Sequence, residues 1–597
     1  MRSEPWHMSY GAIVTDAGVR FRVWAPQVQT LSVKIGGCLF PMARTGEDFE
    51  VTVPDANAGD KYSLLLDQAK ERPDPVSRSQ PEGVHGPSSV VDVNAFVWED
   101  QNWKGIPLED YIIYELHTGT FSPNGTFAGI ITKLPHLKEL GVTAIEIMPV
   151  AEFPGNRNWG YDGVDLYAPH SAYGGPEGLK SLVNACHREG LAVVLDVVYN
   201  HLGPDGNYLG DFGPYFTDCY KTPWGPAINY DGPGSDGVRR FIIENALYWL
   251  TEYHIDALRL DAIHGIFDFS ARHVLAELAS RFQEQSARLG RQAWVIAESD
   301  LNDVRVIQPR AMGGHQLDAQ WNDEFHHSIV SFLTDADRGF LSGFGRVEHI
   351  RKAIAEGFVY DGCYSPYRRR RFGSSSKDLP GQQFVVFLQN HDQVANTNLG
   401  FRLHELVSFE VYQTAVALLL CSPNLPLLFM GEEFANTGPF LYFTSHTDPA
   451  LAKAVSEGRR KEFADFAISG EFPDPQALET FEKSKINWSL MEDPEHRAIF
   501  RLYQRLIGLR KQWPCLNNCR KDLTRIESDE EARSLSMERS DPAGSRARLI
   551  CDFGKSESSL SAEGGPWEML LRTAPAAPCA RLFISQGTEA RAAAPIG

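Results

Sequence analysis

Short apolar runs alternate with helix-like stretches between residues 111 and 430. The apolar runs are YIIYELH, VTAIEIMPV, LAVVLDVVYNH, IDALRLDAIH, AWVIAESD, FVVFLQNHD and LPLLFMGEE, and segments such as GLKSLVNACHREG and VRRFIIENALYWLTEYH lie between them. Continuous apolar strands that alternate with helices are typical of a parallel sheet covered on both faces. At least seven such strands predict an α/β fold, a (β/α)8 TIM barrel with long insertions, in preference to an open doubly wound sheet.

Regions without this alternation precede and follow the predicted barrel. Residues 10–95 carry short runs rich in β-branched and aromatic residues, such as FRVWAPQVQTLSVKI, which predict a sandwich of short strands. Residues 73–92 are rich in Pro, Gly and Ser and predict an ordered linker that lies against the barrel. After about Asn517 the pattern favours a small β domain. We therefore expect three domains: an N-terminal β-sandwich of carbohydrate-binding-module type over residues 1–100, the catalytic barrel over 101–515 and a C-terminal β domain over 516–597.

The length and charge of the chain narrow the range of its partners. A chain of 597 residues exceeds the roughly 250–300 residues at which a single hydrophobic core stops growing. The formal net charge of −20 argues against binding to nucleic acid, which needs clustered Lys and Arg, and against anionic membranes. An uncharged ligand is compatible with this charge. Nucleotide binding has no support, because no GxGxxG, GxxxxGKS or GxxxxGKT motif follows a predicted strand.

Cysteine usage and the apolar segments indicate a reducing cytoplasm. Nine cysteines are scattered with no CxxC pair, which argues against a disulfide framework or a zinc site. The N-terminal stretch MRSEPWHMSYGAIV lacks the apolar run of a signal peptide. Residues 416–430 are the most apolar segment, but Pro423 and Pro426 interrupt it. We expect a helix end followed by a buried strand there rather than a membrane span.

Polar residues at the strand ends carry the candidate chemistry. In a barrel of this kind, a charged residue at the carboxyl end of a strand faces the active-site mouth. Any one such residue alone is compatible with a structural ion pair at the rim. A set of them on separate strands favours a catalytic site, because buried carboxylates are costly unless they are paired. Four different predicted strands end in such residues: Asp196 and His201, Arg259 and Asp261, Glu298, and His391 and Asp392.

Paired carboxylates without metal-ligand spacing suit the cleavage of glycosides. One carboxyl group protonates the leaving oxygen, and the other acts as nucleophile or base. Arg259 lies two residues before Asp261, so both side chains face the same side of the strand and the guanidinium keeps that carboxylate ionised. Glu298 follows the apolar run AWVIA, where partial desolvation raises a carboxyl pKa towards that of a working acid. Asp392 and the two histidines are then candidates to hold sugar hydroxyls.

Aromatic residues crowd the same loops and are candidates for stacking against sugar rings. Ordinary packing explains any one of them equally well. Tyr161, in the loop NWGYDGVDLYAPHSAYGGP, is the residue that we expect to stack on the substrate. The full set is Trp159, Tyr161, Trp224, Trp321, Tyr367 and Tyr442.

Four short motifs resemble the signature regions of the α-amylase family of glycoside hydrolases in order and spacing: DVVYNH, ALRLDAIH, IAESD and FLQNHD. The resemblance implies a retaining mechanism with Asp261 as nucleophile, Glu298 as acid/base and Asp392 as transition-state stabiliser. It also implies that His264 either reaches the neighbouring subsite or is structural. The segment RFRVWAP resembles the β-sandwich that precedes the barrel in branching enzymes and isoamylases. The positions that the resemblance assigns to holding the cleaved ring are Asp196, His201, Arg259 and His391.

Longer segments are similar to the maltooligosyltrehalose trehalohydrolase family: PDPVSRSQPEGVHGPS, WNDEFHHS, NHDQVANTNLG and PFLYFTSH. This resemblance implies hydrolysis of the α-1,4 bond next to the terminal trehalose of maltooligosyl trehalose, and a pathway link to the synthase that makes this substrate. Asp323, Glu324 and the PFLYF loop then either help to select the trehalose end or serve as loop packing. Many α-amylases hold calcium through the Asn of the first motif. Asn200 is present but no companion acidic loop is recognisable, so we expect no required metal and no cofactor.

Two other functions are compatible with parts of this pattern. A 1,4-α-glucan branching enzyme shares the sandwich, the barrel and the three carboxyl groups. It differs in that a sugar hydroxyl, rather than water, resolves the glycosyl-enzyme, and the NHDQ and PFLYF segments favour the trehalohydrolase over it. A catalytically inactive carbohydrate-binding protein is expected to lack one of the three carboxyl residues, and none is missing.

Overall fold

The computed structural model describes residues 6–396, 400–465, 473–558, 560 and 567–585. Its centre is a closed barrel of eight parallel strands in the order β10-β11-β14-β17-β18-β19-β22-β23, with β23 paired to β10. The predicted TIM barrel is confirmed, and the seven apolar runs contain seven of its eight strands. The strands are β10 (Ile113–Leu116), β11 (Ala144–Ile147), β14 (Ala192–Val197), β17 (Ala257–Leu260), β18 (Trp294–Ala297), β19 (Ala319–Trp321), β22 (Phe384–Phe387) and β23 (Leu425–Phe429).

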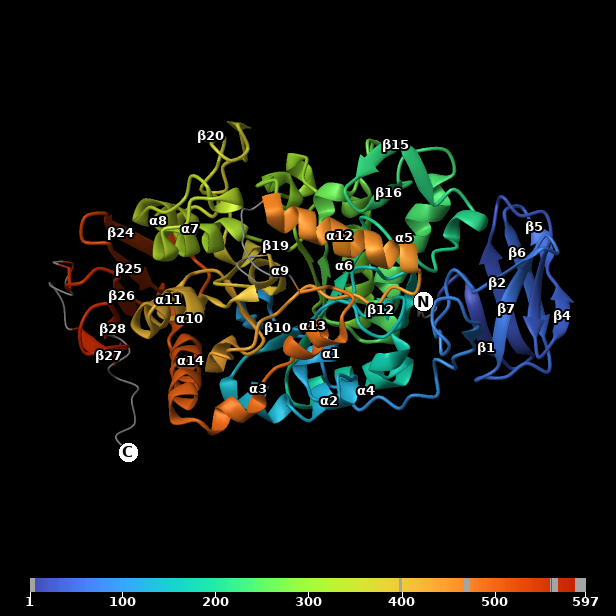
Figure 1. Ribbon diagram of the computed structural model, residues 1–597, viewed down its shortest axis with the longest axis horizontal. Helices are drawn as coiled ribbons and strands as arrows, with labels where there is room; N and C mark the ends of the chain where they lie inside the picture. Colours follow the sequence, from blue (N-terminus) through green and yellow to red (C-terminus); the bar gives the residue numbers. More distant parts are fainter. Residues whose placement is uncertain (1–5, 397–399, 466–472, 559, 561–566, 586–597) are drawn as a thin grey trace.

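Helices cover the outside of the barrel (Figure 1). The longer ones are α3 (Leu134–Leu140), α4 (Gly175–Arg188), α5 (Ser235–Glu252), α6 (Val274–Leu289), α7 (Asp323–Thr334), α8 (Val347–Ala355), α11 (Phe409–Cys421), α12 (Pro449–Asp465) and α14 (Pro494–Gln512). Shorter ones are α1 (Thr118–Phe121), α2 (Phe127–Ile131), α9 (His391–Ala395), α10 (Leu403–Leu406), α13 (Leu478–Lys483) and α15 (Pro514–Asn517). The end of α11 followed by β23 confirms the prediction for residues 416–430. None of the helices in the described part of the chain is long and apolar enough to cross a membrane.

The N-terminal region is built from two antiparallel sheets. One has the order β1-β2-β6-β5, and the other has the order β4-β3-β7-β8 with β9 paired to β7. Residues of β2 alternate as expected for a half-buried strand, since Val19, Phe21 and Val23 are buried and the arginines between them are not. The strands are β1 (Gly11–Thr15), β2 (Gly18–Trp24), β3 (Leu31–Ile35), β4 (Cys38–Pro41), β5 (Ala43–Thr45), β6 (Asp48–Val53), β7 (Lys61–Leu66), β8 (Lys70–Arg72) and β9 (Ser88–Ser89).

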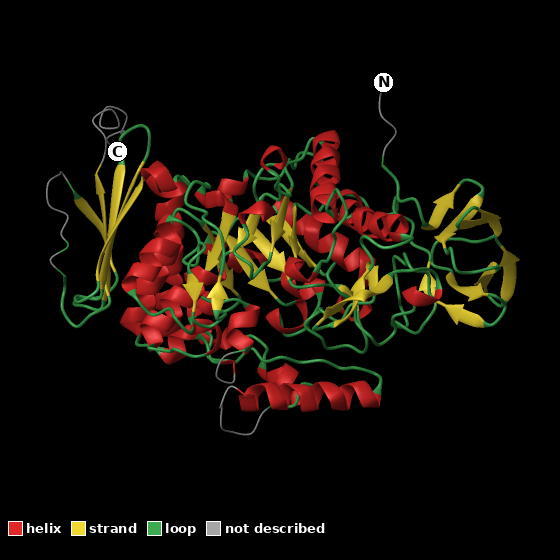
Figure 2. Ribbon diagram, turned by 90° about the horizontal axis from the view of Figure 1, so that it is seen from above, coloured by secondary structure: helices red, strands yellow, loops and turns green. Residues whose placement is uncertain are grey.

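The C-terminal region is one antiparallel sheet of five strands in the order β24-β25-β26-β28-β27. It lies at the end of the molecule opposite the N-terminal sheets (Figures 1 and 2) and packs against α11. Its strands are β24 (Thr524–Asp529), β25 (Ser534–Ser540), β26 (Arg546–Asp552), β27 (Glu568–Arg572) and β28 (Cys579–Ser585). The loops of the barrel contain three two-stranded antiparallel sheets. They are formed by β12 (Ala151–Glu152) with β13 (Asp165–Pro169), β15 (Phe216–Thr222) with β16 (Gly225–Ile228), and β20 (Tyr364–Ser365) with β21 (Arg370–Arg371).

Residues 73–92 join the N-terminal sheets to the barrel and are irregular apart from β9. Arg78 in this linker is buried and forms an ion pair with Glu252 at the end of α5, with 2.8 Å between Nη2 and Oε1. Its Nη1 donates a hydrogen bond to the carbonyl of Ala12 in β1 at 3.1 Å. The linker therefore lies against the barrel, as predicted.

Replacing Arg78 with methionine is expected to lower the free energy of unfolding by about 3 kcal/mol, because the carboxylate of Glu252, whose side chain is only 13% exposed, then loses its partner. Urea unfolding followed by circular dichroism measures the change. Lys61→Met is the matched control, since its ion pair with Glu82 is about half exposed on both sides and contributes little. Equal losses in the two variants contradict the proposed importance of the linker contact.

Candidate active site

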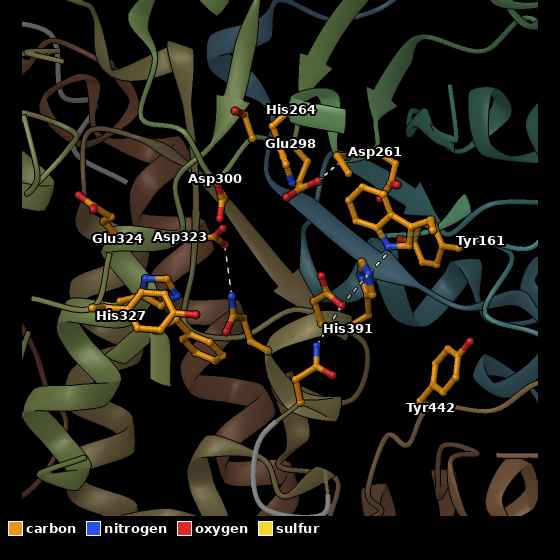
Figure 3. A pocket seen from close by; sticks show the side chains of 18 of the residues that line it. Tyr161, Asp261, His264, Glu298, Asp300, Asp323, Glu324, His327, His391 and Tyr442 are labelled. Atoms are coloured by element: carbon orange, nitrogen blue, oxygen red, sulfur yellow. Dashed lines mark hydrogen bonds and ion pairs between the residues drawn. The ribbon is translucent and has the colours of Figure 1, made fainter. Parts of the chain in front are cut away.

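The strand-end residues meet at one end of the barrel, where a cavity of about 620 Å³ opens (Figure 3). Two of the predicted residues, Asp196 and Arg259, are 2% and 1% exposed and lie buried beside Asp261. The structure therefore brings the predicted set together. The members that line the cavity are Tyr161, His201, Asp261, His264, Glu298, Asp323, Glu324, His391 and Asp392.

Arg259 in β17 contacts the carboxyl groups of Asp261 and Glu298, the predicted nucleophile and acid. Its Nη1 donates to Asp261 Oδ1 and Asp196 Oδ2, each at 2.8 Å, and its Nη2 lies 3.8 Å from Glu298 Oε2. The guanidinium also lies over the ring of Trp321, 4.3 Å from its centroid. Because one guanidinium contacts both Asp261 and Glu298, the two carboxyl groups face the same space and lie within reach of one sugar ring. The predicted contact between Arg259 and Asp261 is confirmed.

Glu298 follows β18 directly and is set up to carry a proton. Burial raises the pKa of its carboxyl group well above the ordinary value, and the charge of Asp261 adds to the rise against the opposing charge of Arg259. The backbone N–H of Ala262 donates to Glu298 Oε2. Ala262 has a φ of 37°, a backbone conformation that is uncommon for a non-glycine residue. This backbone geometry fixes the acid next to Asp261.

His391, Tyr161 and Asp196 form a hydrogen-bonded row in the wall of the cavity. Tyr161 Oη donates to Asp196 Oδ2 at 2.6 Å and lies 2.9 Å from His391 Nε2. The rings of Tyr161 and His391 stack with centroids 5.3 Å apart. Glu115 in β10 accepts a hydrogen bond from the backbone N–H of His391 at 3.0 Å and contacts its Nδ1. Burial is the largest influence and acts to lower the pKa of His391, but the charge of Glu115, its hydrogen bond to the ring and the charge of Asp392 together outweigh burial, so the pKa is raised.

Sequence reasoning missed two buried acids inside the barrel, Glu115 and Glu146. They are register partners on β10 and β11, and each is 1% exposed. Burial raises the pKa of Glu146 well above its ordinary value, and the charge of Glu115 adds to the rise. The sequence did hold a sign of these two acids, because a glutamate stands in the middle of each of the apolar runs YIIYELH and VTAIEIMPV. A buried charge is costly unless it is paired or hydrogen-bonded.

Replacing Glu115 with glutamine is expected to reduce kcat about 10- to 100-fold, because a buried hydrogen bond to a charged group contributes about 1.5–3 kcal/mol. Loss of the negative charge lowers the pKa of His391, so the imidazolium form is lost at a lower pH than in the wild type. Histidine NMR titration and a kcat–pH profile measure the two effects. Glu139→Gln, at an exposed position, is the control, and an unshifted His391 titration in the Glu115 variant contradicts the coupling.

Asp392 lies in the first turn of α9, and its side chain is 51% exposed. Asn396 Nδ2 donates to Asp392 Oδ1 at 3.3 Å.

On the neighbouring wall, His201 stacks on Trp224 with centroids 5.4 Å apart, and its Nε2 lies 3.0 Å from the carbonyl of Tyr161. Burial lowers the pKa of His201, which leaves a neutral imidazole suited to hydrogen bonds with sugar hydroxyls.

Asp323 and Glu324 begin α7 and have different surroundings. Gln393 Nε2 donates to Asp323 Oδ1 at 3.3 Å, and burial raises the pKa of Asp323 to about 7. Glu324 Oε2 accepts hydrogen bonds from the backbone N–H groups of Val359 at 2.6 Å and Tyr360 at 2.9 Å. That oxygen holds the loop before Tyr360, so loop packing is the favoured alternative for Glu324, while Asp323 keeps an oxygen available to the cavity.

The predicted aromatic residues also divide into two groups. Trp321 is 2% exposed and packs beneath Arg259, so its role is structural. The other five line the cavity: Trp159, Tyr161, Trp224, Tyr367 and Tyr442. Stacking of Tyr161 on a sugar stays a prediction.

Asn200 is engaged within the site. Its Nδ2 donates to Asp261 Oδ2 at 3.2 Å, and its Oδ1 lies 3.1 Å from His201 Nδ1. Across the part of the chain that the structure describes, no group of three or more His, Cys, Asp or Glu side chains is placed to hold a metal ion. The two hydrogen bonds of Asn200 orient Asp261 and His201.

Comparison with known proteins identifies several relatives. Residues 76–214 match the family described as the alpha amylase catalytic domain. The malto-oligosyltrehalose trehalohydrolase of Saccharolobus solfataricus is 48% identical over 85% of this chain and 87% of its own length. A 1,4-alpha-glucan branching enzyme of Pseudoalteromonas atlantica is 26% identical over 88% of this chain and 71% of its own. A Salmonella typhimurium protein, provisionally named an alpha amylase, has a crystal structure that matches 97% of this chain and 100% of its own with a TM-score of 0.90 and 40% identity.

Proposed function

The chain belongs to the malto-oligosyltrehalose trehalohydrolase family of α-amylase-type glycoside hydrolases, and we propose that it releases trehalose through Asp261, Glu298 and Asp392. The bond cleaved is the α-1,4 glucosidic bond next to the terminal trehalose of maltooligosyl trehalose. The observation that carries the mechanism is the contact of the Arg259 guanidinium with both Asp261 and Glu298. This contact orients the carboxylate of the nucleophile and places the acid beside it.

The first step forms a glycosyl-enzyme. Asp261 attacks the anomeric carbon while Glu298 gives its proton to the glycosidic oxygen, so the bond to trehalose breaks and trehalose leaves as an alcohol. The raised pKa of Glu298 supports this role, because the group must be protonated at neutral pH. Asp392 faces the ring as positive charge develops on it and stabilises that charge.

The second step is the same chemistry in reverse with water. Glu298, now a carboxylate, takes a proton from a water molecule whose oxygen attacks the anomeric carbon. The bond to Asp261 breaks, and the shortened maltooligosaccharide leaves with its α configuration retained. His201 and His391 support the hydroxyls of this ring, together with Tyr161.

The trehalose unit is proposed to lie beyond Glu298. The acid must reach the leaving oxygen, so the leaving group occupies the side of Glu298 away from Asp261 and Tyr161. Figure 3 shows Asp300, Asp323 and His327 on that side of the cavity. Their polar atoms suit a compact disaccharide rich in hydroxyl groups.

The test is incubation with purified maltooligosyl trehalose followed by chromatography of the sugars. Free trehalose as the main product supports the proposal. Release of glucose or maltose without trehalose contradicts it, and α-1,6-branched products from amylose would favour the branching enzyme instead. The identity of 48% to a trehalohydrolase against 26% to a branching enzyme favours the first outcome.

We also propose a cytoplasmic setting in which a synthase supplies the substrate by converting the terminal α-1,4 linkage of a maltooligosaccharide into an α,α-1,1 linkage. All nine cysteines are free, which supports a reducing compartment. Fractionation of cells followed by the trehalose-release assay tests the compartment.

A further inference from the structure

A chain of polar contacts connects the surface helix α12 to Asp392. Val455 and Arg459 of α12 line the cavity. Arg459 Nη2 donates to Asn396 Oδ1 at 2.6 Å and to the carbonyl of Ala395 at 3.4 Å. Asn396 Nδ2 in turn donates to Asp392 Oδ1 at 3.3 Å. Arg459 of the helix is therefore connected to the carboxyl group of Asp392 by two hydrogen bonds that share the side-chain amide of Asn396.

Arg459 is itself held in place. Its guanidinium lies over the ring of Tyr442, 5.2 Å from the centroid. The start of α12, which crosses the face of the barrel in Figure 1, is anchored by Asp205. Asp205 Oδ2 accepts from Thr447 Oγ1 and the backbone N–H of Thr447, both at 2.8 Å, and from the N–H of Asp448 at 3.2 Å. The helix is thus a fixed support for its arginine.

Asp392 needs such support more than the other two catalytic carboxyl groups. Asp261 Oδ1 accepts a hydrogen bond from Arg259 Nη1 at 2.8 Å, and Glu298 Oε2 accepts one from the backbone N–H of Ala262. Asp392 is 51% exposed, and its distance of 4.0 Å to His391 Nε2 is too long for a hydrogen bond. A half-exposed carboxylate without a fixed partner samples several rotamers, which weakens its interaction with the charged ring.

We propose that Arg459 is a positioning residue that acts on Asp392 through Asn396. A guanidinium only donates hydrogen bonds, so Arg459 selects the amide orientation in which the oxygen of Asn396 faces the arginine. The NH2 group then faces Asp392 and fixes its carboxylate in the rotamer that meets the developing positive charge. The inference deepens the proposed function, because it rests on the role assigned to Asp392.

The test is a double-mutant cycle with Arg459→Met and Asn396→Ala. Each single variant is expected to lose about 3- to 10-fold in kcat, the value of one hydrogen bond, with KM changed less than about twofold. The double variant is expected to lose no more than the larger single loss, because both residues act through the same chain. Arg459→Lys is expected to have a kcat between those of Arg459→Met and the wild type, because an ammonium group still donates to Asn396 Oδ1.

The cycle is measured with α-maltosyl fluoride as well as maltooligosyl trehalose. The fluoride presents the same ring to Asp261 and Asp392 but carries no trehalose, so the relay is tested even if the wild type releases no trehalose. Arg460→Met is the matched control, because Arg460 is the exposed neighbour on α12 and should leave kcat unchanged. Melting temperatures identify variants that fail to fold. Additive losses in the double variant, or a raised KM with unchanged kcat, overturn the proposal in favour of direct sugar binding by Arg459.

Discussion

An Asp261→Asn variant is expected to lose at least about 10⁴-fold in kcat on maltooligosyl trehalose, the scale of loss when a nucleophile is removed. The neutral amide does not attack the anomeric carbon, so no glycosyl-enzyme forms. The substitution keeps the size of the side chain. Arg259 still pairs with Asp196 at 2.8 Å, so the buried guanidinium is not left without a partner and the fold is retained.

Trehalose release measures the loss for Asp261→Asn, and thermal unfolding checks that the variant is folded. Asp236→Asn, at an exposed position on α5, is the control and should match the wild type. Mass spectrometry after rapid acid quenching of a reaction with α-maltosyl fluoride adds a direct readout, since the wild type passes through a transient covalent adduct at Asp261 and the variant does not. If the variant retains more than about one per cent of wild-type kcat, the assignment of Asp261 is wrong, because removing a nucleophile reduces kcat much further than that.

The barrel could be predicted because its strands are buried on both faces, and continuous apolar runs report that burial directly. β19 was the exception. It has three residues, with Gln320 in the middle, and each neighbouring strand pairs with only two of them. A strand this short, with a polar residue inside, leaves no run for a pattern to detect.

The convergence of the candidate catalytic residues could be predicted because each stands at the end of an apolar run, and the barrel brings the carboxyl ends of its strands to one rim. The contacts that support these residues left no such pattern. Glu115 is 276 positions from His391, and Arg459 is 63 positions from Asn396. Such contacts follow from how loops and strands pack in three dimensions, which no local sequence spacing records.

The Glu298→Gln variant is expected to lose about 10²- to 10⁴-fold in kcat on maltooligosyl trehalose, the range of a general acid–base residue. Glutamine fills the same volume but supplies no proton to the leaving oxygen. Fluoride needs no such proton, so formation of the glycosyl-enzyme from α-maltosyl fluoride should stay within about tenfold of the wild type, far less than the loss of an essential acid. Asp261→Asn should fail on both substrates, so the two carboxyl groups are separated by this comparison.

The variant should also lose one limb of the pH profile. Burial, with the charge of Asp261, raises the pKa of Glu298, and wild-type activity should be present below this raised pKa and fall as the pH rises through it. Glu298→Gln has no such proton to lose, so its residual rate should not show that alkaline fall. The glycosyl-enzyme then accumulates because no base activates water, and azide, a nucleophile that needs no base, should release it as α-maltosyl azide. An alkaline limb that persists in the variant, together with no response to azide, would show that another group holds the catalytic proton.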